Sequence, residues 1–181
     1  MNRLLKHTAA AIVLAVAATM LITTPASAVR IETSIEDLAP LYDCPTDTGN
    51  VCFKHGNAPA GTNARTYCFV DDFDLILSEG VSNRFGFINF QALVDKNQST
   101  DCFRGGTRTS VDDDTPLRAC ANPNCGELSD LAFGDELHVY CMRPGSDGNQ
   151  WVGIFNANGQ HAGFTRRSDT NLSPFVFISD C

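Results

Sequence analysis

Short segments of alternating apolar and polar residues recur along the chain after its first 30 residues. In the clearest of them, 136–141, one face carries Leu137 and Val139 and the other carries His138 and Tyr140. Strict alternation of this kind is typical of a strand with one buried face. Further apolar segments occur at 64–70, 73–77, 84–90, 151–155 and 163–165. None keeps a helical period for more than about two turns, so the pattern predicts an all-β fold.

Glycine-containing turns separate these segments. The strongest turn signal is Phe133-Gly134-Asp135, which joins 125–132 to 136–141. Two apolar segments joined by a short turn are typical of a β-hairpin. We therefore expect 125–132 and 136–141 to pair with each other.

The first 28 residues follow a different pattern. Arg3 and Lys6 precede an apolar run of 14 residues from Ala9 to Ile22, and small residues follow up to Ala28. This order is typical of a secretory signal peptide. The run is shorter than the roughly twenty residues that a membrane-spanning helix needs. We expect cleavage after residue 28, secretion and no membrane anchor; the alternative is an uncleaved start that packs on the folded domain.

All eight cysteines fall in the part that would be exported, at positions 44, 52, 68, 102, 120, 125, 141 and 181. An even number of cysteines in a short exported chain predicts structural disulfides. Zinc binding is disfavoured because there is no CxxC pair and no histidine at ligand spacing from a cysteine. We expect no metal and no cofactor.

The cysteines fall into two sets of four whose central gap, 52 to 68 and 125 to 141, is the same. Around that gap Tyr67-Cys68 matches Tyr140-Cys141, and further on Gly86-Phe87 matches Gly163-Phe164. An ordered set of matches indicates an internal repeat. We expect two tandem domains, 29–103 and 117–181, joined by a polar linker at 104–116.

The expected hairpin would bring Cys125 close to Cys141, and the repeat then extends this pairing to the other cysteines. The predicted disulfides are Cys125–Cys141, Cys120–Cys181, Cys52–Cys68 and Cys44–Cys102. Four cysteines allow three connectivities, so other pairings stay open. Two disulfides per unit, at roughly 2 to 4 kcal/mol each, would stabilise domains too small to bury a large core.

The charge balance narrows the choice of partner. Loss of residues 1–28 removes Arg3 and Lys6 from the 13 basic residues and none of the 21 acidic residues, which leaves a net charge of −10. Nucleic acid and other polyanions are therefore improbable partners. The run Asp112 to Asp114 lacks the alternating pattern of a calcium loop and is interpreted as a solvated loop.

The second half contains Leu117-Arg118, Phe133-Gly134-Asp135, Trp151-Val152 and Gly163-Phe164 in that order. This order resembles the bacterial SH3-like (SH3b) domain of exported proteins, most clearly over 117–172. The first half keeps fewer of the motifs and resembles a degenerate second copy. The resemblance implies two tandem small SH3-like barrels, each with two disulfides, that bind peptide or glycan, in related proteins often from the cell wall.

The resemblance also implies a ligand groove lined by aromatic side chains, with acidic residues available for a ligand amine. The aromatic candidates are Tyr140, Trp151, Phe155 and Phe164, and the acidic candidates are Asp112, Asp113 and Asp114. Tyr140 is expected to be exposed because it shares the polar face of its strand. Trp151 also fits a core position.

The sequence favours a secreted, non-catalytic binding module for an extracellular peptide or cell-wall glycopeptide. The cysteines are better explained by disulfides than by catalysis, and His55, His138 and His161 form no zinc-binding pair. One alternative is a secreted peptidase inhibitor, because Cys44-Pro45 and Val51-Cys52-Phe53 resemble the start of crystallin-like inhibitors. A rigid loop at 45–49 or 59–61 would favour the inhibitor. A second alternative is a secreted hydrolase, whose paired carboxylates would leave no local signature. The oligomeric state is not predicted.

Overall fold

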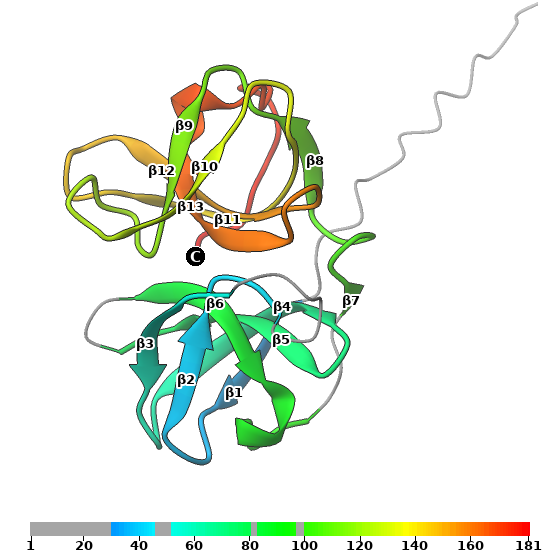
Figure 1. The fold of residues 1–181 in the computed structure, drawn as a ribbon, viewed down its shortest axis with the longest axis vertical. Helices are drawn as coiled ribbons and strands as arrows, with labels where there is room; N and C mark the ends of the chain where they lie inside the picture. Colours follow the sequence, from blue (N-terminus) through cyan, green and yellow to red (C-terminus); the bar gives the residue numbers. More distant parts are fainter. Residues whose placement is uncertain (1–29, 46–51, 81–82, 97–99) are drawn as a thin grey trace, which may run out of the picture.

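The computed structural model describes residues 30–45, 52–80, 83–96 and 100–181, and these residues form an all-β structure of two sheets, as predicted (Figure 1). The expected signal peptide, residues 1–28, lies outside the described residues. Among the described residues, helix is limited to two short 3-10 turns, η2 (Phe90–Ala92) and η3 (Arg167–Asp169). Within the described ranges, no helix has the length and apolar character needed to cross a bilayer.

The first sheet has the strand order β1-β4-β5-β6-β2-β3, with β7 beside β4. Its strands are β1 (Ile31–Ser34), β2 (Ala39–Tyr42), β3 (Lys54–Ala58), β4 (Asn63–Val70), β5 (Phe73–Ser78), β6 (Arg84–Asn89) and β7 (Thr100–Asp101). The ladder between β4 and β7 is parallel, and the other ladders of this sheet are antiparallel.

The second sheet, read from β8, has the order β8-β11-β12-β13-β9-β10. Its strands are β8 (Thr107–Ser110), β9 (Thr115–Arg118), β10 (Glu127–Leu131), β11 (Glu136–Pro144), β12 (Gln150–Asn156) and β13 (His161–Arg166). The order is the same as in the first sheet, with β8 in the place of β1, β11 in the place of β4, and so on to β10 in the place of β3. The two halves of the chain thus have the same strand order, although few of their matched positions carry the same residue.

The turns that precede β4 and β11 are also equivalent. Gly61 and Gly134 have positive φ angles of 75° and 85°. Their backbone N–H groups donate to the carbonyls of Ile35 and Val111 at 2.8 and 3.0 Å. A positive φ favours glycine, since it has no Cβ to be strained. The sequence pattern predicts a turn only at Gly134-Asp135, because the first half has a threonine where the second has the aspartate.

The sheets are open, whereas the sequence led us to expect closed barrels. The hydrogen-bonded path ends at β1 and β3 in one sheet and at β8 and β10 in the other, and no ladder joins those ends among the described strands. The ladders β2–β6 and β9–β13 are each a single residue pair, Tyr42↔Phe87 and Arg118↔Phe164. Each sheet therefore curls around its core without closing.

Two expectations about the second half are wrong. Residues 107–110, expected in a linker, form β8 and pair with β11 inside the second sheet. The expected hairpin does not form either, because β10 pairs with β9 and not with β11. The Gly134 turn is present, but it joins two strands at different places in the sheet.

All four predicted disulfide pairings, Cys44–Cys102, Cys52–Cys68, Cys120–Cys181 and Cys125–Cys141, are wrong for the same reason. Without the β10–β11 hairpin, Cys125 has no position opposite Cys141. The disulfides are Cys44–Cys52, Cys68–Cys102, Cys120–Cys125 and Cys141–Cys181. In each set of four, the first cysteine bonds the second and the third bonds the fourth.

Local strand pairing explains both kinds of disulfide. Cys44–Cys52 and Cys120–Cys125 close the connections between the paired strands β2–β3 and β9–β10. Cys68–Cys102 and Cys141–Cys181 fix a later segment beside β4 or β11 in parallel, through β7 in one half and the bridge Met142↔Asp180 in the other. Four disulfides indicate an oxidising, extracellular environment.

Three apolar clusters make up the core in the described part of the chain. One is enclosed by the first half and contains Leu41 and Ile76; one is enclosed by the second half and contains Leu137 and Ile154. The third lies between the halves and is rich in aromatic residues: Tyr67, Phe73, Phe85, Phe87, Tyr140, Trp151, Phe155 and Phe164. The halves therefore share a core, and their two sheets face each other in Figure 1.

The contact between the halves is reciprocal. Phe85, the second residue of β6, donates its N–H to the carbonyl of Ala119, the residue after β9, at 3.4 Å. Ala162, the second residue of β13, donates to the carbonyl of Asp43, the residue after β2, at 2.6 Å. Such an exchange of equivalent contacts is the pattern of a twofold interface. Here both copies belong to one chain.

Candidate functional site

The four aromatic residues expected to line a groove are buried. The exposed fractions are 3% for Tyr140, 2% for Trp151 and zero for Phe155 and Phe164. All four belong to the aromatic cluster between the halves. A groove lined by all four is therefore not found among the described residues, although Trp151 borders a small hollow of about 90 Å³ beside Arg166 and Asp169.

Tyr140 shows why the alternation pattern misled. The face of β11 that carries Tyr140 and His138 packs against the first half, so the strand is buried on both faces. The Tyr140 hydroxyl donates to the carbonyl of Cys102 at 2.8 Å, and His138 Nδ1 lies 2.8 Å from the carbonyl of Gly105. Polar side chains can line a buried face when each has such a partner.

Trp151 is held by hydrogen bonding at the edge of the core. Its Nε1 donates to Asp147 Oδ1 at 3.0 Å, and the guanidinium of Arg166 lies over its ring at 5.6 Å from the centroid. Asp147 also accepts from Asn149 and Arg166. The hydrogen bond from Trp151, followed by those from Asn149, lowers the pKa of the Asp147 carboxyl well below its usual range. The contacts of Trp151 are therefore those of a structural residue, and its ring is not free to stack on a ligand.

The acidic run Asp112 to Asp114 is exposed and borders the Gly134 turn. Asp114 Oδ1 accepts the N–H of Phe133 at 2.7 Å, and the N–H of Asp112 donates to the carbonyl of Asp169 at 2.9 Å. These bonds join the β8–β9 connection to its neighbours. The run is not among the residues that line the groove described next.

A groove of about 530 Å³ lies between the two halves. Its lining comes from the first half through Phe53, Lys54, His55 and Arg84, and from the second half through Ala119, Cys125, Gly126, Glu127 and Leu128. This volume is within the range of small-molecule and peptide sites, ~300 to 1,000 Å³. The residues after Cys52 and those after Cys125 are equivalent in the repeat, so the groove lies where the two copies face each other.

The groove has an apolar wall. Phe53 is 58% exposed although it is a large apolar residue. Leu128, on β10, and Ala119, the residue after β9, are the apolar lining residues from the second half. An exposed aromatic side chain beside a concave surface is a common feature of ligand sites.

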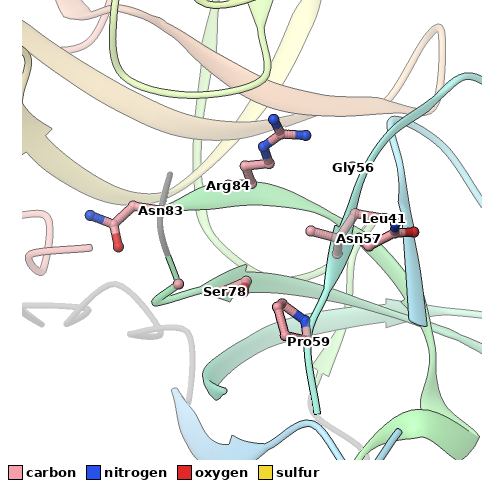
Figure 2. Close-up of a pocket in the computed structure, with 8 residues that line it drawn as sticks. Leu41, Gly56, Asn57, Pro59, Ser78, Asn83 and Arg84 are labelled. Carbon is pink, nitrogen blue, oxygen red and sulfur yellow. The ribbon is translucent and has the colours of Figure 1, made fainter. Parts of the chain in front are cut away.

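Arg84 is the central cation of the groove. Its Nη1 donates to the carbonyl of His55, and its guanidinium lies against Gly56, where a Cβ would collide with it. Figure 2 shows the Arg84 side chain pointing away from Ser78 and Pro59, toward the strands of the second half. Arg84 also borders a smaller hollow of about 350 Å³ on the first half (Figure 2). The lack of a side chain at Gly56 thus leaves room for the guanidinium at the edge of both.

His55 forms part of the groove lining, and its ring lies against the backbone of Gly86. Both ring nitrogens are buried and make no well-formed hydrogen bond in the part of the chain that the structure describes. Burial lowers the pKa of His55 below its usual range, against a smaller opposing effect of the Tyr42 backbone. The imidazole is therefore neutral at neutral pH.

Asp43 and His161 join the halves beside the groove. The Asp43 carboxylate is fully buried; one oxygen accepts the N–H of Phe53 at 2.7 Å, and the other lies 3.1 Å from His161 Nδ1. Asp43 also has ligand atoms near Cys44 and Cys52, within 4.8 Å. Those two sulfurs are bonded to each other, so this cluster is not available to a metal ion.

The loops expected of a peptidase inhibitor are only partly described. Residues 46–49 lie outside the described residues. The turn 59–61 is exposed, but it is held by hydrogen bonds from Gly61 to Ile35 and from Thr62 to Pro59. It has the geometry of its counterpart in the second half and is a turn of the repeated fold.

The groove residues Phe53, Lys54, His55 and Arg84 were not predicted as site residues from the sequence. Alignment of the repeat from its second cysteine could have drawn attention to the first three, since Cys52-Phe53-Lys54-His55 corresponds to Cys125-Gly126-Glu127-Leu128. No local motif marks Arg84. Its position against Gly56 appears only when β3 and β6 are placed in space.

No protein-family model matches the chain, and no curated protein sequence matches it either. Among solved structures, one of four matching chains is described as "Structure of NlpC1 from Trichomonas vaginalis", with a TM-score of 0.32 and 9% identity. The match covers 83% of this chain and 48% of that one, so this chain spans about half its length. At this TM-score and identity the likeness supports no argument about fold or function. The structure defines the class of the protein as an all-β, disulfide-bonded chain of two sheets.

Proposed function

We propose that the chain is a secreted, non-catalytic binding protein for an extracellular peptide, including the peptides of a cell wall, and that it binds in the groove between its halves. The observation that supports this most directly is the groove itself: a concave surface of about 530 Å³ with an exposed Phe53 on one side and Leu128 on the other. Apolar concave surfaces with a few polar groups are the usual form of a ligand site.

The fold supports a binding role in a second way. Phe53 follows Cys52 directly, and its N–H donates to the buried Asp43 carboxylate, so a disulfide and a hydrogen bond hold its backbone. A groove whose walls are fixed before the ligand arrives loses little entropy on binding. We also propose that each half is an SH3-like unit, and units of this kind are expected to bind peptide or glycan.

The test is retention of the oxidised protein, residues 29–181, on purified peptidoglycan and on immobilised extracellular peptides. Phe53→Ser is the groove variant. Phe133→Ser is the matched control, because Phe133 is also an exposed phenylalanine, at 72%, but lies on the Gly134 turn. We expect retention of the wild type and of Phe133→Ser, and a clear loss for Phe53→Ser. Equal retention of all three would remove the groove from the proposal, and no retention of any would overturn the function.

A further inference from the structure

The cations of the groove differ from most others in the protein. Of the lysine and arginine side chains that the structure describes, seven make ion pairs within 4.0 Å: Arg30, Arg65, Lys96, Arg104, Arg108, Arg118 and Arg166. Lys54 and Arg84 make none among the described residues, although both line one groove of a chain with net charge −8. A cationic site without its own counter-charge, on an acidic protein, favours an anionic ligand.

The acidic residue of the groove does not neutralise these cations. Glu127, from β10, lies 3.7 Å from the guanidinium of Arg118, a neighbour on β9. The His55 ring is neutral and contributes no charge. The positive charge of the groove therefore comes from Lys54 and Arg84. The local balance is therefore positive while the whole chain is negative.

The shape of the cationic group points to a carboxylate. Arg84 uses Nη1 on the His55 carbonyl and keeps further N–H groups for a ligand. A planar guanidinium suits a planar carboxylate, which accepts two hydrogen bonds from it. The bond to His55 and the contact with Gly56 hold the guanidinium in place before binding.

We propose that the groove binds a peptide through a free carboxylate, held by Arg84 and Lys54, while an apolar side chain of the peptide packs on Phe53 and Leu128. The inference rests on the proposed function and names the chemistry of its ligand. Multiply charged polymers are disfavoured, since the rest of the surface repels them. The carboxylate belongs either to the peptide C-terminus or to an Asp or Glu side chain.

The experiment uses two pools of random N-acetylated tetrapeptides, one with free C-terminal carboxylates and one amidated. The oxidised protein is incubated with each pool, and the retained peptides are identified by mass spectrometry. Retention from the free-acid pool alone indicates the C-terminal carboxylate. Retention from both pools, enriched in Asp and Glu, indicates a side-chain carboxylate. Either result supports the proposal.

Amidated peptides without Asp or Glu that are retained as well as free acids would overturn the carboxylate inference and leave peptide binding intact. Retention of no peptide from either pool, together with no retention on peptidoglycan, would overturn the proposed function itself. The two failures are therefore distinguishable.

Variants connect the result to the named residues. Lys54→Gln changes an exposed side chain and should weaken binding of the retained free-acid peptide, while Arg84→Gln should weaken it more, by about tenfold or above. Lys96→Gln is the matched control for Lys54→Gln, since Lys96 is exposed and pairs with Glu36. Unchanged affinity of both groove variants would contradict the proposal.

Arg84→Gln could also disturb β3, so a second variant keeps the arginine and moves it. Gly56→Ala places a Cβ where the Arg84 guanidinium lies, and we expect a loss of free-acid binding comparable to that of Arg84→Gln. Gly80→Ala is the control, because a Cβ there meets nothing closer than 3.5 Å. Thermal unfolding of each variant shows whether the fold is retained. A folded Gly56→Ala variant that binds as well as Gly80→Ala would contradict the assigned role of Arg84.

Discussion

The two halves of the chain share a framework and differ in the chemistry of the groove. Strand order, positive-φ turn and disulfide pattern are the same in both. At the groove, however, Lys54 and His55 at the start of β3 correspond to Glu127 and Leu128 at the start of β10, and Arg84 at the start of β6 corresponds to His161 on β13. The first half therefore supplies the cations, and the second half supplies an apolar and acidic border.

This difference separates what the fold requires from what the groove requires. Equivalent strands keep the same exposure pattern, as β3 and β10 do residue by residue. Burial is thus set by strand position, which the repeat preserves. The groove lies where the halves face each other, and each half contributes a different part of its lining. A lining residue of one half can therefore differ from its counterpart in the other half. Such a groove can accommodate an asymmetric ligand.

The disulfides give the largest expected effects. Replacement of Cys68 and Cys102 by alanine opens a loop of sequence separation 34, and replacement of Cys141 and Cys181 opens one of 40. Chain-entropy arguments give about 4 kcal/mol for each of these. The short loops, Cys44–Cys52 and Cys120–Cys125, have separations of 8 and 5, which correspond to about 2 kcal/mol.

Denaturant unfolding of the four double-alanine variants measures these differences. We expect two pairs of similar midpoints, with the long-loop pair lower in both halves. Similar losses for long and short loops would contradict the entropic ranking. A large difference between the two long-loop variants would instead show that the halves are not energetically equivalent.

Alkaline pH gives the next largest effect. Burial raises the pKa of Tyr67 to about 12 and also raises that of Tyr140. In the unfolded chain a tyrosine loses its proton near pH 10, as the ordinary value is about 10. Between about pH 10 and 12 the unfolded state therefore binds fewer protons, and the free energy of unfolding falls as pH rises. For Tyr67 the fall amounts to about 3 kcal/mol.

The measurement is denaturant unfolding across this pH range, for wild type and Tyr67→Phe. The variant lacks the Tyr67 titration and should lose stability less steeply. The Tyr140 contribution remains in both. Parallel curves for the two proteins would contradict a buried, protonated Tyr67.

Sequence patterns gave the all-β class because they depend on local alternation, which the strands retain. They did not give strand pairing. Alternation shows which residues share a face, but β11 is buried on both faces, and nothing local shows that β10 pairs with β9. Because the disulfide pairings were derived from the expected hairpin, all four of them were wrong as well. The groove was not predicted for a similar reason: Arg84 and Ala119 line one groove only when the halves pack together.

The two facing tyrosines allow a smaller comparison. Their rings lie 6.1 Å apart across the contact between the halves. The Tyr140 hydroxyl donates to the Cys102 carbonyl, whereas the buried Tyr67 hydroxyl makes no well-formed hydrogen bond with a described residue and interacts with the guanidinium of Arg65. Tyr140→Phe should therefore cost about 1 kcal/mol at neutral pH, and Tyr67→Phe should cost less. Thermal unfolding at neutral pH measures both, and a larger loss for Tyr67→Phe would contradict the assignment.

The smallest effect concerns His55, whose counterpart in the second half is Leu128. Burial lowers the pKa of His55, so the unfolded state binds a proton more readily than the folded state. As pH falls from the ordinary histidine value of about 6.5 toward the lowered one, the free energy of unfolding falls with it. His55→Leu, which gives β3 the residue of β10, removes this titration. We expect wild type and His55→Leu to unfold alike at neutral pH and to diverge in mild acid, where the variant keeps more of its stability. If acid lowers both to the same extent, then His55 is not held neutral in the folded protein, and Leu128 differs from it only in shape.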